Sequence, residues 1–95
     1  MAALSSLDAA LKIDPEHLPS LMCKGPSLAA VGRRDQAQAV YEKALGINPS
    51  LVSVWYFKGI NELVTNRRDA GVRSLRKVIE LGTDDELVAD AREAL

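Results

Sequence analysis

The chain has 95 residues, of which 47% are hydrophobic and 26% are charged, and this composition is ordinary for one small globular domain. Its formal net charge of −1 gives no general attraction to nucleic acid or to an anionic membrane surface. No apolar stretch approaches the roughly 20 residues that a membrane span needs, so membrane insertion is not expected. No secretory signal is visible, which leaves the compartment unknown and the cytoplasm as the default expectation.

Helical spacing dominates the beginning of the chain. Alanine and leucine are plentiful and β-branched residues form no sustained alternating run, so we expect an all-α fold. Residues 1–13 are predicted to form one helix and residues 18–31 the next. Gly32 is expected to end the second helix, because glycine adopts the left-handed conformation without steric cost.

Asp35 and Asp69 are predicted to begin two later helices as N-cap residues, since an aspartate oxygen accepts hydrogen bonds from the free N–H groups of a first helical turn. Gln38 follows Asp35 by three residues, as in a capping box. The helix that begins at Asp35 is expected to stop before Pro49, which lies beyond its last turn.

The second half of the chain repeats this scheme. Residues 52–64 are predicted to form a helix, followed by a turn at Asn66. The stretch from Thr83 to Glu86 reads as a capping box that starts a last helix ending at Leu95. This helix has a polar outer face, as the terminal helix of a stacked array requires.

A charged tripeptide recurs at a fixed interval. Arg33-Arg34-Asp35 and Arg67-Arg68-Asp69 are 34 residues apart. Other residues match at the same shift, namely Lys24 with Lys58, Gly25 with Gly59, Lys43 with Lys77, Ala3 with Ala37, Ala10 with Ala44, Leu11 with Leu45, Ile13 with Ile47 and Pro15 with Pro49. A period of 20–50 residues indicates stacked repeats, in which each unit buries its apolar face against its neighbours.

These residues resemble the tetratricopeptide repeat, a 34-residue helix–turn–helix unit with the pattern W-x2-L-G-x2-Y, A-x3-F, P. The central unit reads Leu21-x2-Lys24-Gly25-x2-Leu28, Ala37-x3-Tyr41, Pro49, and the third reads Trp55-x2-Lys58-Gly59-x2-Glu62, Gly71-x3-Leu75. The resemblance implies a single domain over residues 1–95, built as a short right-handed α-solenoid of antiparallel helix pairs. Its expected parts are the second half of a repeat (1–17), two full repeats (18–51 and 52–84) and a capping helix (85–95).

The resemblance further implies a non-catalytic scaffold that binds a peptide or helix of a protein partner in a concave, mostly apolar groove. The family's groove-facing places hold Pro19, Met22, Pro26, Ala29 and Ala30 in the central unit, and Ser53, Tyr56, Ile60, Leu63 and Val64 in the third. The alternative is that part of this strip is covered by neighbouring helices in a longer protein. Pro26 is expected to interrupt and kink the first helix of the central unit. The family's clamp for a terminal carboxylate is not supported, because its places lack the required Lys, Asn and Arg.

Two further classes stay open. One is a self-assembling structural module, in which the helix over residues 1–13 lacks its partner helix and exposes Leu4, Leu7 and Leu11 for a homo-oligomer contact. The other is an accessory repeat region of a larger enzyme or of a secretion or assembly component.

Residues for catalysis or cofactor binding are scarce, so no enzyme activity, metal site or cofactor is expected. One cysteine and one histidine are too few for a zinc site. Cys23 is predicted to be a small buried hydrophobe and His17 to lie at the surface or at a helix start. Isolated glycines give no phosphate-binding loop.

Charge is distributed unevenly along the chain. Residues 67–77 contain five basic residues and one acidic residue, whereas residues 80–95 contain six acidic residues and one basic residue. We expect the basic residues to lie on an exposed face and to be compensated within the chain, with an acidic partner as the alternative. Aromatic residues do not alternate with the arginines, so nucleic acid is not an expected partner. Glu62 replaces an apolar residue of the pattern and is predicted to pair with Lys58, one turn earlier.

Overall fold

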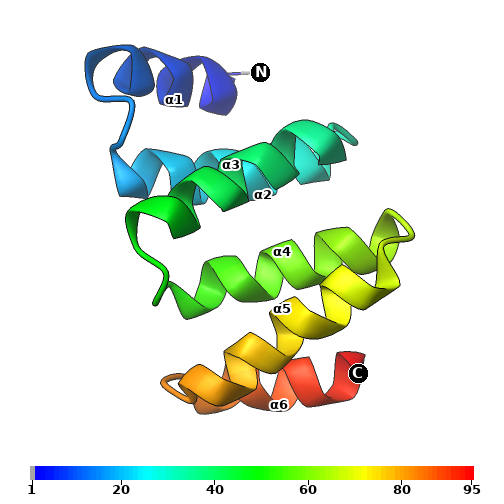
Figure 1. Cartoon of the computed structure of the whole chain (residues 1–95). Coiled ribbons are helices and arrows are strands. Elements are labelled where there is room, and N and C mark those ends of the chain that lie inside the picture. The colour runs from blue at the N-terminus through cyan, green and yellow to red at the C-terminus, as the bar shows by residue number, and fades with distance from the viewer. Residues whose placement is uncertain (1) are drawn as a thin grey trace. The chain divides into compact units, whose positions relative to one another are not determined.

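The computed structural model describes the backbone of residues 2–95 and the side chains from Ser6 onward. Six helices and no strand occur in this described part, which confirms the all-α prediction (Figure 1). None of the helices within residues 2–95 has the length and apolar character that a membrane crossing requires. The chain divides between Pro49 and Ser50 into two compact units, and each is described by itself.

The first unit holds α1 (Ala2–Ile13), α2 (Leu18–Ala30) and α3 (Arg34–Ile47). Helices α2 and α3 form a pair, and α1 packs against α2. An ion pair of 2.6 Å between Lys24 Nζ and Asp8 Oδ1 links α2 to α1. The buried apolar side chains of this unit are Leu21, Leu28, Ala37, Tyr41, Ala44 and Leu45.

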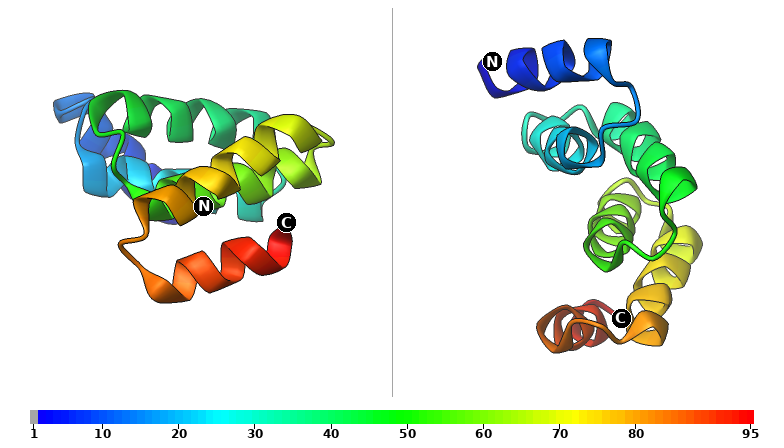
Figure 2. Two further views of the ribbon diagram at one scale, coloured as in Figure 1. Left: turned by 60° about the horizontal axis from the view of Figure 1, so that its bottom comes forward. Right: turned by 90° about the vertical axis from the view of Figure 1, so that its left-hand side faces the viewer.

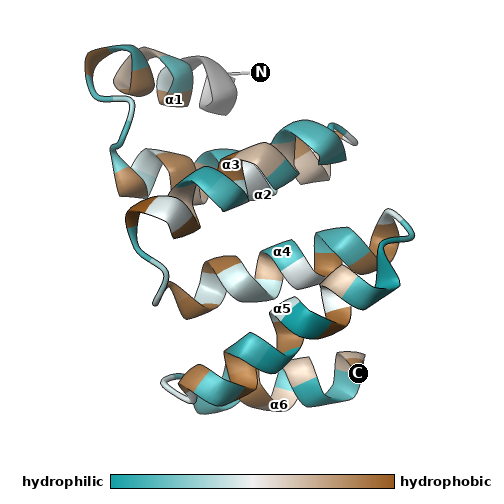
Figure 3. Cartoon of the chain, viewed as in Figure 1, coloured by the Kyte–Doolittle hydropathy of each residue, from teal (hydrophilic) through white to brown (hydrophobic). Residues whose placement is uncertain are grey.

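The second unit holds α4 (Val52–Val64), α5 (Arg68–Leu81) and α6 (Asp85–Ala94). Its core is a cluster of Leu75, Val78 and Ala91, so α6 contributes to the same interior as α5. Helix α6 contacts both α4 and α5 and runs beside them in the two views of Figure 2. Helix α5 is strongly amphipathic: hydrophobic and hydrophilic residues follow one another along its ribbon in Figure 3, at a spacing that places them on different faces of the helix.

The turn inside each helix pair has the same hydrogen bonds. In the first pair Gly32 N donates to Ala29 O (3.1 Å) and Arg33 N donates to Leu28 O (2.9 Å). In the second, Asn66 N donates to Leu63 O (3.3 Å) and Arg67 N donates to Glu62 O (2.7 Å). These bonds define a Schellman motif, whose left-handed residue is Gly32 (φ 84°) or Asn66 (φ 66°). The predicted helix end at Gly32 and turn at Asn66 are confirmed.

The predicted N-caps at Asp35 and Asp69 are wrong. The N-cap residues are Arg33 and Arg67, neither of which caps through its side chain, and both aspartates lie inside the first helical turn. The Schellman turn is short, so the helix starts two residues earlier than the aspartate suggests. An acidic side chain in the first turn is still favourable, because it faces the positive end of the helix dipole.

Two other helix starts do use side-chain caps. The N-cap of α6 is Asp84 rather than Thr83, and its Oδ1 accepts from the N–H groups of Glu86 and Leu87, each at 3.1 Å. The N-cap of α2 is His17, whose Nδ1 accepts from Ser20 N at 3.3 Å. The expectation that His17 makes a helix-start contact is therefore confirmed.

Glycine sets how closely the helices of a pair approach. A Cβ atom built on Gly25 would overlap the ring of Tyr41, which is 2% exposed. In the second pair a Cβ on Gly59 would lie 2.9 Å from Leu75 Cγ, and one on Gly71 would lie 3.0 Å from the backbone oxygen of Gly59. Gly71 therefore permits a backbone contact that the alanine of the repeat pattern would oppose.

Candidate functional site

None of the predicted groove residues of α2 is buried. Pro19 and Ala30 are exposed, and Met22, Pro26 and Ala29 are partly exposed. The buried residues of the same helix are Ser20, Leu21, Gly25 and Leu28. All five predicted residues thus keep solvent-accessible surface within this unit.

Pro26 does not end α2, which continues as an α-helix from Leu18 to Ala30. The loss of one backbone N–H is tolerated within a helix whose other side is held by α3. One turn of the helix also carries a side-chain hydrogen bond, from Ser27 Oγ to Cys23 O at 2.9 Å. The kink expected at Pro26 stays a prediction.

The prediction that Cys23 is buried is wrong, because its side chain is exposed. The buried neighbours Leu21 and Gly25 are each two positions away along α2. Residues two apart on a helix point in nearly opposite directions, so Cys23 faces away from the core.

The predicted groove residues of α4 divide into two groups. Val64 is 58% exposed, and Ser53 is partly exposed. Tyr56, Ile60 and Leu63 are also partly exposed, but they pack against the cluster of Leu75, Val78 and Ala91. These three residues therefore lose part of their exposed surface to the core of their own unit, and the alternative expectation, burial under helices of a longer protein, stays a prediction.

Phe57 extends the apolar surface of α4 beyond the predicted places. It is 40% exposed, and its ring meets that of Tyr56 edge to face, with centroids 5.9 Å apart and planes at 65°. Such aromatic pairs are worth about 1 kcal/mol beyond their buried area. Phe57 is not among the predicted groove residues, but the adjacent aromatic residues in the sequence were a usable sign.

Glu62 is buried, at 2% exposure, and lies in a network of polar side chains between α4 and α5. Lys58 Nζ donates to Glu62 Oε2 at 2.8 Å, which confirms the predicted pair. Ser74 Oγ donates to Glu62 Oε1 at 2.6 Å and accepts from Lys58 Nζ at 3.2 Å. Burying a carboxylate is costly unless its charge and oxygens are satisfied, and these contacts meet that need.

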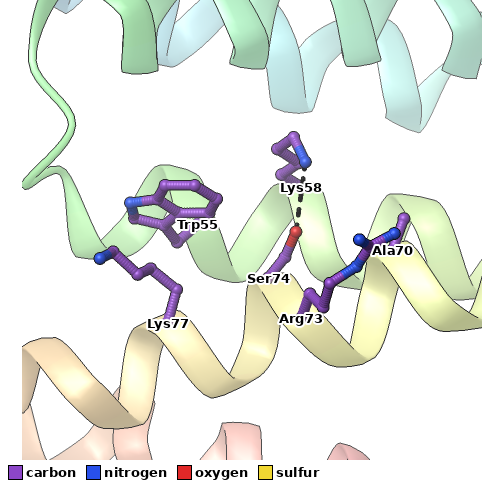
Figure 4. Close-up of a pocket in the computed structure, with 6 residues that line it drawn as sticks. All are labelled: Trp55, Lys58, Ala70, Arg73, Ser74 and Lys77. Atoms are coloured by element: carbon purple, nitrogen blue, oxygen red, sulfur yellow. Dashed lines mark hydrogen bonds between the residues drawn. The ribbon is translucent and has the colours of Figure 1, made fainter.

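A pocket of about 240 Å³ lies beside this network. Figure 4 shows its six lining residues, which come from α4 (Trp55, Lys58) and from α5 (Ala70, Arg73, Ser74, Lys77); we call it the α4–α5 pocket. Lys58 Nζ lies 5.6 Å from the centre of the Trp55 ring, within reach of a cation–π interaction.

The basic residues of α5 are not compensated by ion pairs within the described part of the chain. Arg68, Arg73, Arg76 and Lys77 form none with any residue that the structure describes, although six acidic residues follow them in the sequence. Arg73 Nε donates to Asp69 O at 3.4 Å, which leaves its charge unpaired. The expected compensation within the chain therefore does not occur through ion pairs of these four side chains with described residues.

The described residues contain no group of three or more His, Cys, Asp or Glu side chains that could hold a metal ion. Burial raises the pKa of Tyr41 to about 12, and the nearby positive charge of Arg34 opposes this rise only in part. The buried phenol belongs to the interior of the α2–α3 pair and not to a reactive surface.

Comparisons with known proteins agree on the repeat. Residues 25–51 match the family model for the tetratricopeptide repeat. The structure is similar to that of TTC0263, a thermophilic TPR protein of Thermus thermophilus, with 25% identity and a TM-score of 0.85 over 96% of this chain. YrrB, described as a TPR protein with an unusual peptide-binding site, matches over 95% of this chain at 21% identity and a TM-score of 0.85.

A third similar structure is MamA, with 20% identity and a TM-score of 0.80 over 84% of this chain. The chain spans about half the length of these structures, 47% of TTC0263, 46% of YrrB and 47% of MamA. No curated protein matches the sequence significantly.

Proposed function

We propose, from the match of residues 25–51 to the tetratricopeptide repeat and the likeness to solved TPR proteins, that this chain is a scaffold that binds a peptide or helix of a protein partner along the apolar strips of α2 and α4. The repeat is typically a non-catalytic protein-interaction module. The α2 strip is Pro19, Met22, Pro26, Ala29 and Ala30, and the α4 strip is Ser53, Tyr56, Ile60, Leu63 and Val64.

The observation that carries the proposal is the exposure pattern of these two helices. None of the ten strip residues is buried, whereas each helix buries four residues that lie outside its strip. An apolar face that stays in contact with water favours association with another apolar surface. Tyr56 adds a hydroxyl group and Met22 an adaptable side chain, both common in peptide contacts.

A peptide ligand is the occupant that we favour. The similar protein YrrB is described as having a peptide-binding site, and its fold matches nearly the whole of this chain. A helix or an extended peptide can present apolar side chains at the spacing of such strips, and a rigid helix pair loses little conformational entropy on binding. No residue of either strip supplies a charge, so the ligand is expected to be apolar where it meets them.

The test is to select binding peptides from a displayed library and to compare their affinities for wild type, Val64→Asp and Ile13→Asp. Val64 lies in the α4 strip and is 58% exposed, so an aspartate there is tolerated by the fold but repels an apolar ligand. We expect Val64→Asp to weaken binding about tenfold or more, which corresponds to about 1.4 kcal/mol. Ile13, 89% exposed and outside both strips, is the matched control. Equal affinities for all three proteins would refute the proposal.

Self-association through α1 is a second candidate, favoured by the exposure of Ile13. Leu7 and Leu11 on the same helix are partly buried, and the side chain of Leu4 lies outside the described residues. A molar mass that rises with concentration for wild type and stays monomeric for Ile13→Asp would support this candidate. A monomer at all concentrations would exclude it.

A further inference from the structure

We propose that the α4–α5 pocket binds one anionic side chain, a carboxylate or a phosphate, of a partner peptide. This site is separate from the apolar strip of α4. The strip residues Tyr56, Ile60 and Leu63 do not line the pocket, and the lining residues Trp55 and Lys58 are not in the strip. The inference therefore goes beyond the proposed function and can succeed or fail without it.

The charge available to a ligand comes from Arg73 and Lys77. The third cation, Lys58, is already paired with Glu62 at 2.8 Å, so these two groups together are neutral. Arg73 and Lys77 form no ion pair with a described residue. A hydrogen bond from Arg73 Nε to Asp69 O leaves the terminal guanidinium nitrogens able to donate to an anion.

The spacing of these two cations also favours an anion. Arg73 and Lys77 are one turn apart on α5, where like charges destabilise a helix. Figure 4 places Lys77 on the Trp55 side of the pocket and Arg73 on the Ala70 side. An anion in the pocket would be attracted by both cations, and this attraction would offset their mutual repulsion.

The remaining walls limit the ligand to a single side chain. The indole of Trp55 and the methyl group of Ala70 are apolar, so they suit the carbon atoms of a side chain below its charged group. Ser74 is 2% exposed, and its hydroxyl is already engaged with Glu62 and Lys58, so the floor is fixed. A volume of about 240 Å³ is smaller than that of a pocket for a drug-sized molecule.

A peptide fits these features better than a nucleic acid. Single-stranded nucleic acid is usually held by several stacked aromatic residues along a basic groove, and Trp55 is the only aromatic residue in the pocket. The net charge of −1 supplies no long-range attraction for a polyanion. One carboxylate or phosphate on a short apolar stem matches both the size and the charge.

Trp55 is the only tryptophan of the chain, so its fluorescence reports on this pocket directly. The probes are three alanine-based pentapeptides that carry phosphoserine, glutamate or serine at the centre, and a short thymidine oligonucleotide. Each is titrated into the 95-residue wild-type chain, into Arg73→Gln/Lys77→Gln and into Arg68→Gln/Arg76→Gln. The second double variant removes the same number of charges from α5 without altering the pocket lining. Thermal unfolding checks that both variants remain folded.

We expect the phosphoserine or glutamate peptide to change the Trp55 emission of wild type, and the serine peptide not to do so. Binding should weaken about tenfold in Arg73→Gln/Lys77→Gln, since each exposed ion pair contributes roughly three- to fivefold to affinity. It should change less than about twofold in Arg68→Gln/Arg76→Gln, and it should fall with added salt. Whether phosphate or carboxylate binds more tightly identifies the source of the anion.

Four results would overturn the proposal. Two concern the Trp55 emission: no change with either anionic peptide up to about 10 mM, or an equal change with the serine peptide. The other two concern affinity: equal weakening in both double variants, or tighter binding of the oligonucleotide than of the peptides. Val64→Asp can lose the binding of the peptides selected from the library without any effect on the Trp55 titration. The failure of one site is therefore distinguishable from the failure of the other.

Discussion

Leu28 of α2 and Glu62 of α4 occupy equivalent places 34 residues apart, and they are 3% and 2% exposed. The partner helices differ in the same sense, since Val40 of α3 corresponds to the buried Ser74 of α5. One helix pair therefore has an apolar interior at this level, and the other has a charged and hydrogen-bonded one.

The lysine one turn before each of these residues explains how both interiors are stable. Lys24 turns outward to pair with Asp8 of α1, whereas Lys58 pairs with Glu62 and Ser74 inside its own helix pair. No described buried side-chain nitrogen or oxygen lacks a hydrogen-bond partner. The comparison teaches that a helix pair of this shape accepts either chemistry, provided that every buried polar atom is satisfied.

Both pairs share the glycine that permits close approach, Gly25 or Gly59, and differ in what fills the space against it. Tyr41 lies against Gly25, and Leu75 lies against Gly59. The shape of the pair thus depends on the small residue, and the identity of the larger one can vary between units.

The largest effect is expected from Lys58→Met, which removes the cation beside the buried Glu62. We expect a loss of about 3 kcal/mol in the free energy of unfolding, because one partner of a buried ion pair is left uncompensated. Urea unfolding measures this loss. The control is Lys58→Met/Glu62→Leu/Ser74→Val, which gives the second pair the apolar interior of the first and should return stability to within about 1 kcal/mol of wild type. If Lys58→Met left the free energy of unfolding unchanged, the charged interior of the second pair would not depend on its cation, and the comparison with the apolar interior of the first pair would fail.

Gly25→Ala is expected to cost about 2 kcal/mol, because the added methyl group overlaps the ring of Tyr41. Gly46→Ala is the matched control within α3, since a Cβ there meets no atom within 4 Å. It should raise stability by up to about 1 kcal/mol through helix propensity alone. If both variants gained stability in thermal unfolding, close approach would not be what glycine provides in the first pair.

High pH should destabilise the first pair through Tyr41. Its pKa is raised to about 12 in the folded chain, against about 10 when unfolded, so folding favours the protonated phenol. Stability is unaffected below pH 10 and falls between pH 10 and 12, by about 2 kcal/mol in all. Tyr41→Phe should remove this fall in the free energy of unfolding, which urea unfolding at pH 9 to 12 measures. It should also remove a tyrosinate absorbance change with a midpoint near pH 12. If the free energy of unfolding of Tyr41→Phe fell with pH as it does in wild type, ionisation of Tyr41 would not be the cause.

The smallest effect is expected from exchanging the left-handed turn residues. Asn66→Gly should stabilise and Gly32→Asn should destabilise, each by about 0.5 kcal/mol, because glycine adopts a positive φ with less strain than asparagine. Thermal unfolding of the two variants side by side provides the measurement. Effects of the same sign would show that the two turns are not equivalent.

Local sequence patterns predicted much of this molecule. The helices, the turns at Gly32 and Asn66 and the pairing of Glu62 with Lys58 depend on residues at most five positions apart, and helix geometry relates such residues directly. The hydrogen bonds that Ser74 makes with Glu62 and Lys58 were not predictable in this way. Ser74 lies 12 residues from Glu62, and their contact depends on how closely α4 and α5 approach.

The errors in predicting the site had similar causes. Cys23 is predicted to lie on the apolar side of its helix, whereas in the structure its position on α2 turns it to solvent. The α4–α5 pocket joins two residues of α4 to four of α5, so neither segment alone indicated it. The uneven distribution of charge was visible in the sequence, but the absence of ion pairs from described residues to Arg73 and Lys77 required the positions of the side chains.

Arg33 and Arg67 each belong to two motifs at once, as the last hydrogen-bonded residue of one helix end and the N-cap of the next helix. The turn consequently has no spare residue. A single insertion there would rotate the following helix by about 100° about its axis and move Ala37 or Gly71 away from the partner helix. Divergence between copies of this unit is therefore confined to substitution at this point, and length variation has to occur elsewhere in the chain.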